Sequence, residues 1–135
     1  KEEGNGTKEK NSTLNTQDEN DEFNTTSDTF FVTSKEFAEN KLLEDYRKKR
    51  TYSKALALAN FYFSQNNYNA ASSWAIVANR IDQEKKRAWY IYIKSKISLK
   101  EYKKASEAIR AYLKMYKSPQ LEELLKVLQM KLQGE

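Results

Sequence analysis

Two consecutive stretches of equal length share one pattern of apolar side chains. Residues 52–85 have the sequence YSKALALANFYFSQNNYNAASSWAIVANRIDQEK, and residues 86–119 have the sequence KRAWYIYIKSKISLKEYKKASEAIRAYLKMYKSP. At this offset Tyr68 matches Tyr102, and each tyrosine follows a short polar bend. A constant period of about 34 residues is typical of repeat proteins, in which each repeat is one supersecondary unit. The pattern therefore predicts two repeats.

Each repeat contains two segments whose apolar residues recur at helical spacing. The chain has only three glycines and one proline, and this scarcity of turn residues favours helices over strands. We therefore expect an all-α fold built from helix–turn–helix units. The predicted buried faces are Ala55, Leu58, Ala59 and Tyr62; Ala71, Trp74, Ala75, Ala78 and Ile81; Trp89, Tyr92, Ile93 and Ile97; and Ala105, Ala108, Ile109, Tyr112, Leu113 and Tyr116.

The repeated pattern resembles the tetratricopeptide repeat (TPR) family over residues 52 to about 119. The resemblance implies a short TPR-like helical hairpin array of about two repeats plus flanking helices. An ordinary helical bundle is the alternative interpretation. The matching positions are Leu58, Ala59, Tyr62, Tyr68, Ala71, Ala75, Ala78 and Asp82, then Trp89, Tyr92, Tyr102, Ala105 and Ile109. The sequence departs from the family at Ala59 and Ile93 (usually glycine), Gln83 (proline), Lys96 (aromatic) and Tyr112 (alanine).

A helix is expected before the repeats, over residues 34–49. Thr33 and Glu36 have the spacing of a capping box, and Val32 would pack on Phe37 as a hydrophobic staple. Whether residues 34–65 form two helices or one long helix stays open. The residues expected to be buried in this first helix are Phe37, Ala38, Leu42 and Tyr46.

A second flanking helix is expected over residues 119–132. Ser118 is a favourable N-cap, and Pro119 suits the first helical position. The helix would carry one apolar stripe, which either covers the end of the array or docks another chain. The stripe consists of Leu121, Leu124, Leu125, Leu128 and Leu132.

The chain divides into two segments of opposite charge. Residues 1–28 contain three lysines and eight acids, with only Leu14 and Phe23 as large apolar side chains, so we expect a disordered acidic tail. Residues 29–135 contain 21 basic and 11 acidic residues and form the predicted TPR-like domain. Both charges are ordinary solvated surface in one interpretation. In the other, the tail rests on the domain and competes with an acidic partner.

The TPR resemblance implies a protein-binding groove, lined by the first helix of each repeat. Its candidate residues are Ser53, Leu56, Asn60, Phe63 and Ser64 in the first repeat and Arg87, Tyr90, Lys94, Ile97 and Ser98 in the second. Arg87, Lys94 and Asn60 would be the polar anchors for an acidic or C-terminal peptide. The alternative is that Arg87 and Lys94 are only solvated helix charges.

Three asparagines in the tail lie in one context. Asn5, Asn11 and Asn24 each precede Gly-Thr, Ser-Thr or Thr-Thr, and each has an acid two residues upstream. This context is the general N-glycosylation acceptor pattern, and its longer form resembles the acceptor site of the bacterial N-glycosylation system, which acts in the periplasm. It predicts a periplasmic protein, with room for an inner-membrane tether upstream of Lys1. A cytoplasmic location is the alternative.

The chain has no cysteine and no histidine, which removes the usual thiol nucleophile, imidazole base and zinc ligands. We therefore expect no enzyme activity, no cofactor and no metal. The predicted function is that of a scaffold in a bacterial envelope assembly, such as a flagellar motor or a DNA-uptake or pilus-like secretion system. The alternative is binding of nucleic acid or another anionic polymer. For that alternative the one dense basic run is residues 47–50, and the other basic residues are spread along the sequence.

Overall fold

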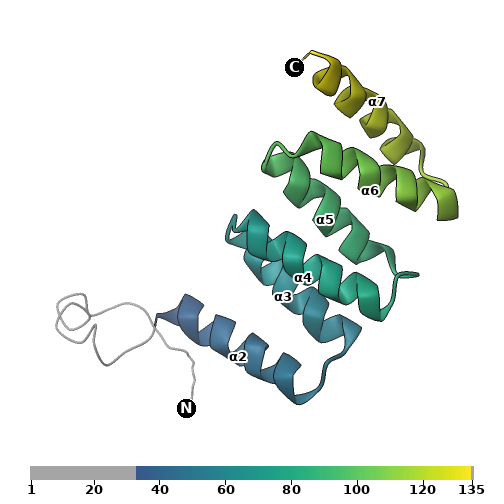
Figure 1. Ribbon diagram of the computed structural model, residues 1–135. Helices are drawn as coiled ribbons and strands as arrows, with labels where there is room; N and C mark the ends of the chain where they lie inside the picture. Colours follow the sequence, from purple (N-terminus) through teal and green to yellow (C-terminus); the bar gives the residue numbers. More distant parts are fainter. Residues whose placement is uncertain (1–32, 135) are drawn as a thin grey trace, which may run out of the picture. The chain divides into compact units, whose positions relative to one another are not determined.

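The computed structural model describes residues 33–134, which contain six α-helices and no strand (Figure 1). The predicted all-α, TPR-like fold is confirmed. The chain divides into residues 1–37 and a compact unit of residues 38–135. The predicted acidic tail, residues 1–28, lies outside the described residues. The helices are α2 (Ser34–Lys48), α3 (Tyr52–Ser64), α4 (Tyr68–Ile81), α5 (Lys86–Ser98), α6 (Tyr102–Met115) and α7 (Pro119–Gln133).

The start of α2 contains the predicted capping box. The Thr33 amide donates to Glu36 Oε1 at 3.2 Å, and the Glu36 amide donates to Thr33 Oγ1 at 3.0 Å. Val32, the other half of the expected staple, lies outside the described residues. Helix α2 ends at Lys48 and α3 starts at Tyr52, so two helices follow one another in this region.

The burial expected for α2 was wrong for Phe37 and is only partial for Ala38, Leu42 and Tyr46. No residue of α2 is fully buried, and Phe37 in its first turn is 64% exposed. Leu42 and Tyr46 are half-buried against the core, and Ala38 is also half-buried. Among the described residues, α2 packs through a few long side chains only, so its first turn stays in solvent. Tyr46 meets the ring of Trp74 edge-on at 4.9 Å between centroids.

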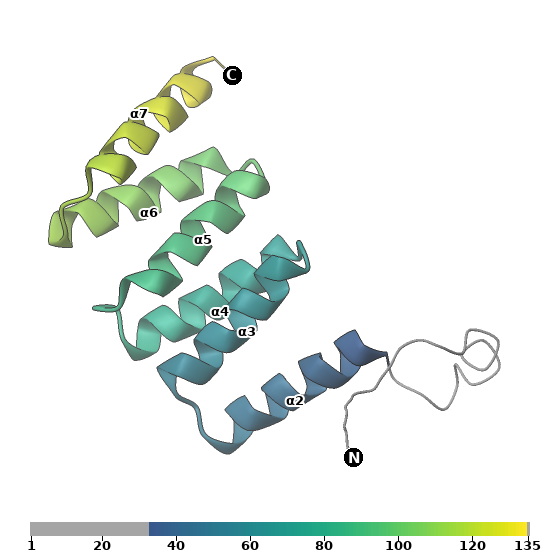
Figure 2. The same cartoon turned by 180° about the vertical axis from the view of Figure 1, so that it is seen from behind.

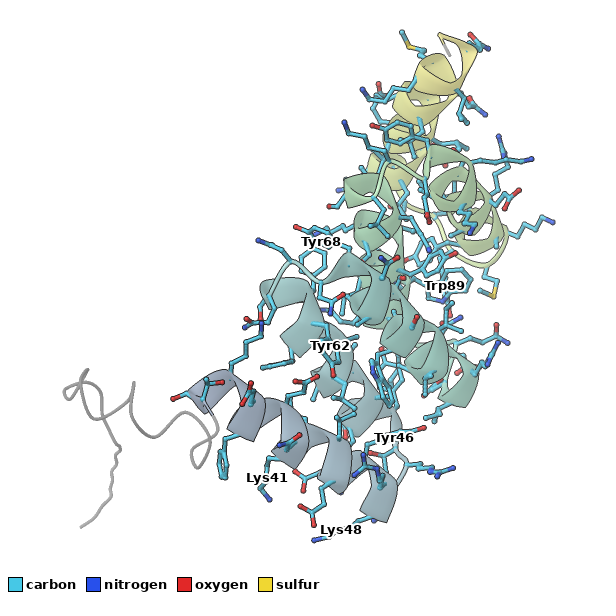
Figure 3. The ribbon with its side chains drawn as sticks, turned by 60° about the vertical axis from the view of Figure 1, so that its left-hand side comes forward. Lys41, Tyr46, Lys48, Tyr62, Tyr68 and Trp89 are labelled. Carbon is cyan, nitrogen blue, oxygen red and sulfur yellow. The ribbon has the colours of Figure 1, made fainter. Side chains whose placement is uncertain are left out.

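Helices α3 and α4 form the first hairpin. The buried residues of α3 are the predicted ones, Ala55, Leu58, Ala59 and Tyr62. Alanines at the interface leave room for close approach of the two helices, as ridge-into-groove packing requires. The Tyr62 hydroxyl donates to Glu39 Oε2 of α2 at 2.6 Å, which ties α2 to this hairpin (Figure 3).

The prediction for the end of α4 was wrong in one position. Ala71, Ala75 and Ala78 are buried, and Trp74 is half-buried, but Ile81 is 43% exposed. Ile81 is the last residue of α4, where the chain turns away towards α5.

Both hairpin turns use the same backbone device at equivalent positions of the two repeats. Asn66 and Lys100 have φ of 60° and 61°, in the left-handed region. After α3, the Asn67 amide donates to the Tyr62 carbonyl at 2.9 Å; after α5, the Glu101 amide donates to the Lys96 carbonyl at 2.8 Å. This six-to-one bond is the mark of a Schellman motif, which commonly has glycine at the left-handed position. Here asparagine and lysine occupy it.

Helix α5 is buried on more faces than its apolar pattern suggested. It packs against α3, α4 and α6, so Ala88, Ile91 and Ser95 are buried together with the predicted Ile93. Trp89, Tyr92 and Ile97 are half-buried. In α6 the buried residues are Ala105, Ser106, Ile109 and Tyr112, while Ala108, Leu113 and Tyr116 are half-buried.

Helix α7 packs against α6 through its leucine stripe. The Ser118 hydroxyl caps the helix by accepting from the Leu121 amide at 3.2 Å, and Pro119 is at the first helical position, both as predicted. Leu121 and Leu128 are buried, and Leu124 and Leu125 are half-buried in the same cluster. The stripe is therefore used within this chain, as a cover for the end of the array.

Candidate protein-binding groove

The candidate groove lies on two neighbouring helices that pack against each other, α3 and α5. Positions one repeat length apart in the sequence fall on equivalent turns of these helices. Asn60 and Lys94 form such a pair, and so do Leu56 and Tyr90. The fold thus brings the two predicted halves of the groove onto adjacent helices.

The three polar candidates are exposed. Asn60, Arg87 and Lys94 lie in solvent, and within residues 33–134 none of their side chains forms a hydrogen bond or an ion pair. Their polar groups are therefore available to a ligand. This contrasts with Lys96, further along α5, whose ammonium is 2.9 Å from Glu101 Oε1.

The apolar candidates are half-buried and partly committed to the core. Leu56 packs on two core clusters, and Phe63 meets the ring of Tyr68 edge-on at 5.4 Å between centroids. Such residues form the floor of a surface and still present part of their side chains to solvent. Ile97 is also half-buried, and Ser53, Ser64 and Ser98 are exposed.

Tyr90 is oriented by a buried neighbour. Its hydroxyl shares a hydrogen bond of 3.2 Å with the hydroxyl of Tyr112, and their ring centroids are 5.9 Å apart. Burial, together with the bond to Tyr90, raises the pKa of Tyr112 to about 12. Tyr112 replaces the small residue usual at this position, and it holds Tyr90 in place from beneath.

The lysine at the unusual position, Lys96, has a structural role. Besides its bond to Glu101 it lies over the Tyr92 ring at 5.5 Å from the centroid, and only 12% of its side chain is exposed. The hydrogen bond from Lys96 holds the pKa of Glu101 below its usual value. Lys96 thus links the end of α5 to the turn that follows. The equivalent position in the first repeat is Tyr62.

Sequence reasoning missed the hydrogen bonds by which two tyrosines and a tryptophan join the repeats. Tyr52 accepts from the Ala88 amide at 3.3 Å, and the Tyr116 hydroxyl donates to the Glu84 carbonyl at 3.1 Å. The Trp89 indole donates to the Gln83 carbonyl at 3.0 Å (Figure 3). All three bonds involve residues 83–88, around the connection between the repeats. The only signal in the sequence was the abundance of tyrosine itself.

A family model described as anaphase-promoting complex, cyclosome, subunit 3, matches residues 28–112, more than half of the chain. The chain belongs to this family. The match spans α2 to α5 and most of α6, and it supports the TPR-type assignment of the repeats. Helix α7 lies beyond it. Neither the curated proteins nor the solved structures gave a match.

Repeats of the TPR type generally bind protein partners and are generally non-catalytic. Membership in this family therefore indicates a protein-interaction scaffold. Within residues 33–134, no helix has the length and apolar character needed to span a bilayer. The same residues contain no cluster of three or more acidic, histidine or cysteine side chains that could hold a metal ion. The acceptor asparagines Asn5, Asn11 and Asn24 lie outside the described residues.

Proposed function

We propose that the chain is a scaffold that holds an acidic or C-terminal peptide of a partner protein in the groove of α3 and α5. The observation that carries the proposal is the set of unpaired polar side chains on this surface. Asn60, Arg87 and Lys94 are exposed and unpaired within the described residues, beside the half-buried Leu56 and Phe63. Two cations and an amide can bind a carboxylate, while the apolar floor accepts side chains of the peptide.

The family supports the assembly part of the proposal. The family is that of a subunit of a complex, which agrees with a role in recruiting neighbours. We propose further that the assembly belongs to a bacterial envelope and that the chain works in the periplasm. This rests on the acceptor context of Asn5, Asn11 and Asn24.

A photo-reactive side chain placed in the groove tests the peptide-binding surface. We expect a variant with the photo-crosslinker at position 60 to capture a partner in native cells, whereas a matched variant at Ser73, exposed on α4, does not. Reversing both groove charges, with Arg87→Glu and Lys94→Glu, should abolish capture at position 60. Equal capture at both positions, or capture that survives the charge reversal, contradicts the groove.

Two further measurements test the finer points. If a carboxylate is the anchor, a synthetic peptide with the partner's free C-terminus binds and its C-terminal amide does not. If the chain is exported to a glycosylating compartment, intact mass spectrometry of the native protein shows added glycan that disappears with Asn5→Gln, Asn11→Gln and Asn24→Gln together. Unmodified native protein contradicts the glycosylation hypothesis.

A further inference from the structure

Alternate connections of the helical array lie along one edge of the unit 38–135. The chain reverses direction at each connection, so the α2–α3, α4–α5 and α6–α7 connections meet on one edge, and the two hairpin turns meet on the other (Figures 1 and 2). The three connections are residues 49–51, 82–85 and 116–118.

Each of these connections carries exposed basic side chains. We call these basic side chains together the basic edge. The surface that they form is positive because few acidic side chains lie among them. Within residues 47–50, 82–86 and 114–118 the acids are Asp82 and Glu84, and Glu122 lies in the first turn of α7, beside the third connection. The one ion pair described for these cations joins Lys48 to Glu44 at 3.7 Å. The basic edge consists of Arg47, Lys48, Lys49, Arg50, Lys85, Lys86, Lys114 and Lys117.

Tyrosine rings position three of these cations. Lys85 Nζ lies 5.5 Å from the centroid of the Tyr52 ring, and Lys86 Nζ lies 5.1 Å from that of Tyr116. Arg50 lies over Tyr46 at 5.9 Å. A cation held over an aromatic face keeps its full charge, unlike one neutralised by a carboxylate. Because Tyr52 is in α3 and Tyr116 follows α6, these contacts also join the three connections into one surface.

Two large apolar side chains are exposed among these cations. Ile81 ends α4 and Met115 ends α6, at equivalent positions of the two repeats, with 43% and 47% of their surfaces exposed. They lie beside the second and third connections. The basic edge therefore combines positive charge with apolar side chains that stay nearly half exposed within the described residues.

This combination matches the surface of a bilayer with anionic lipids. Cations gain from the negative surface potential, and apolar side chains enter the boundary between headgroups and acyl chains. Single-stranded nucleic acid would instead use free aromatic faces for stacking. At this edge the faces of Tyr52 and Tyr116 are covered by lysines, and their hydroxyls bind Ala88 and Glu84.

We propose that the basic edge is a membrane-binding surface that rests on bilayers containing anionic phospholipids. Of the polar anchors of the groove, Asn60 and Lys94 lie away from the basic edge, whereas Arg87 directly follows Lys86 in the first turn of α5. The inference goes beyond the proposed peptide binding and does not depend on it.

Co-sedimentation of the full 135-residue chain with vesicles tests the proposal. We expect binding to equal parts of phosphatidylglycerol and phosphatidylcholine at low salt, loss of binding at high salt, and none to phosphatidylcholine alone. Lys85→Gln with Lys86→Gln should lower the partition coefficient about 25-fold, because each cation near an anionic surface contributes about fivefold. The pair Lys114→Gln and Lys117→Gln, whose lysines contact no aromatic ring within residues 33–134, should give a similar loss.

A control pair comes from the first turn of α6, at the opposite end of that helix from Lys114. Lys103→Gln with Lys104→Gln changes the net charge equally and should lower vesicle binding less than about threefold, because those side chains lie beside the other turn. Circular dichroism of each variant verifies that the helices are retained. Equal losses for the edge pairs and the control pair would mean that total charge alone drives binding, and would overturn the proposal.

Met115→Gln separates a membrane from a nucleic acid. It should weaken vesicle binding about fivefold, because the polar glutamine replaces an apolar side chain that is transferred from water into the bilayer. Retention of a duplex DNA fragment should stay unchanged, because it depends on the cations. Absence of vesicle binding at low salt would overturn the proposal. DNA retention that depends on the basic edge, with vesicle binding insensitive to Met115→Gln, would assign the edge to nucleic acid instead.

Discussion

Replacing Lys100 by glycine should stabilise the protein. Lys100 ends the turn between α5 and α6 with φ of 61°, a conformation in which the Cβ atom crowds the backbone. A residue with a Cβ is destabilised there by roughly 1–2 kcal/mol, whereas glycine is not. Glycine also has more freedom in the unfolded chain, which offsets roughly 0.5–1 kcal/mol of this gain. The expected net rise in the free energy of unfolding is therefore about 0.5–1 kcal/mol.

The Lys100 side chain forms no hydrogen bond or ion pair within the described residues, so its loss costs little. Urea unfolding followed by circular dichroism measures the change, and a thermal scan should show Tm higher by about 4 °C for a domain of this size. Lys100→Ala is the control, because alanine keeps the Cβ and should match the wild type within about 0.3 kcal/mol. Stabilisation by Lys100→Ala equal to that by Lys100→Gly, or destabilisation by Lys100→Gly, would contradict the strain assigned to Lys100.

The equivalent position in the first repeat should respond differently. Asn66 has φ of 60°, but asparagine tolerates this region better than lysine does. Its Oδ1 also accepts from the Tyr68 hydroxyl at 2.9 Å, a bond that Asn66→Gly would remove. The two turns share one backbone conformation. The difference between Lys100→Gly and Asn66→Gly in the free energy of unfolding therefore measures what the Asn66 side chain contributes.

Two further predictions concern the second repeat and the last helix. The pKa of Tyr112 is raised to about 12 by burial and its bond to Tyr90, so its contribution to stability is fully present below pH 10 and is lost as the pH rises through about 12. Tyr112→Phe should therefore show a shallower loss of stability than the wild type above pH 10 in urea titrations, and an identical slope would contradict the assignment. Leu128→Ala should lower the free energy of unfolding by about 2–5 kcal/mol, because Leu128 is 1% exposed between α7 and α6. Val127→Ala, at a position 41% exposed, should cost less than about 0.5 kcal/mol, and comparable losses for both variants would show that α7 is not held by its leucine stripe.

The sequence predicted the helical elements well because their signals are local and repeated. The constant repeat period aligned both hairpins, and Thr33, Glu36, Ser118 and Pro119 marked two helix starts through side-chain bonds or backbone geometry that involve only near neighbours. Such signals do not depend on what the helix packs against. Burial does depend on it, which is why the expected burial of Phe37 was wrong.

The candidate groove was predicted as a set of positions, but the state of each side chain depends on contacts between repeats. Tyr90 and Tyr112 are 22 residues apart, and no local pattern indicates that their hydroxyls meet. Ser95 lies outside the apolar face predicted for α5, yet it is fully buried because α5 has packed neighbours on several sides. Helical spacing identifies one apolar face, whereas an internal helix of an array buries more than one.

The basic edge illustrates the same limit for charge. In the sequence only residues 47–50 form a dense run, and the lysines at 85, 86, 114 and 117 look scattered. A helical hairpin returns the chain to the same edge after each repeat, so clusters separated by about one period lie on one surface. Basic residues that recur at about the repeat length in the sequence are therefore predicted to lie together on one surface of the folded array. For a repeat protein, clusters of charge are found by aligning the repeats and comparing the residues of equivalent connections.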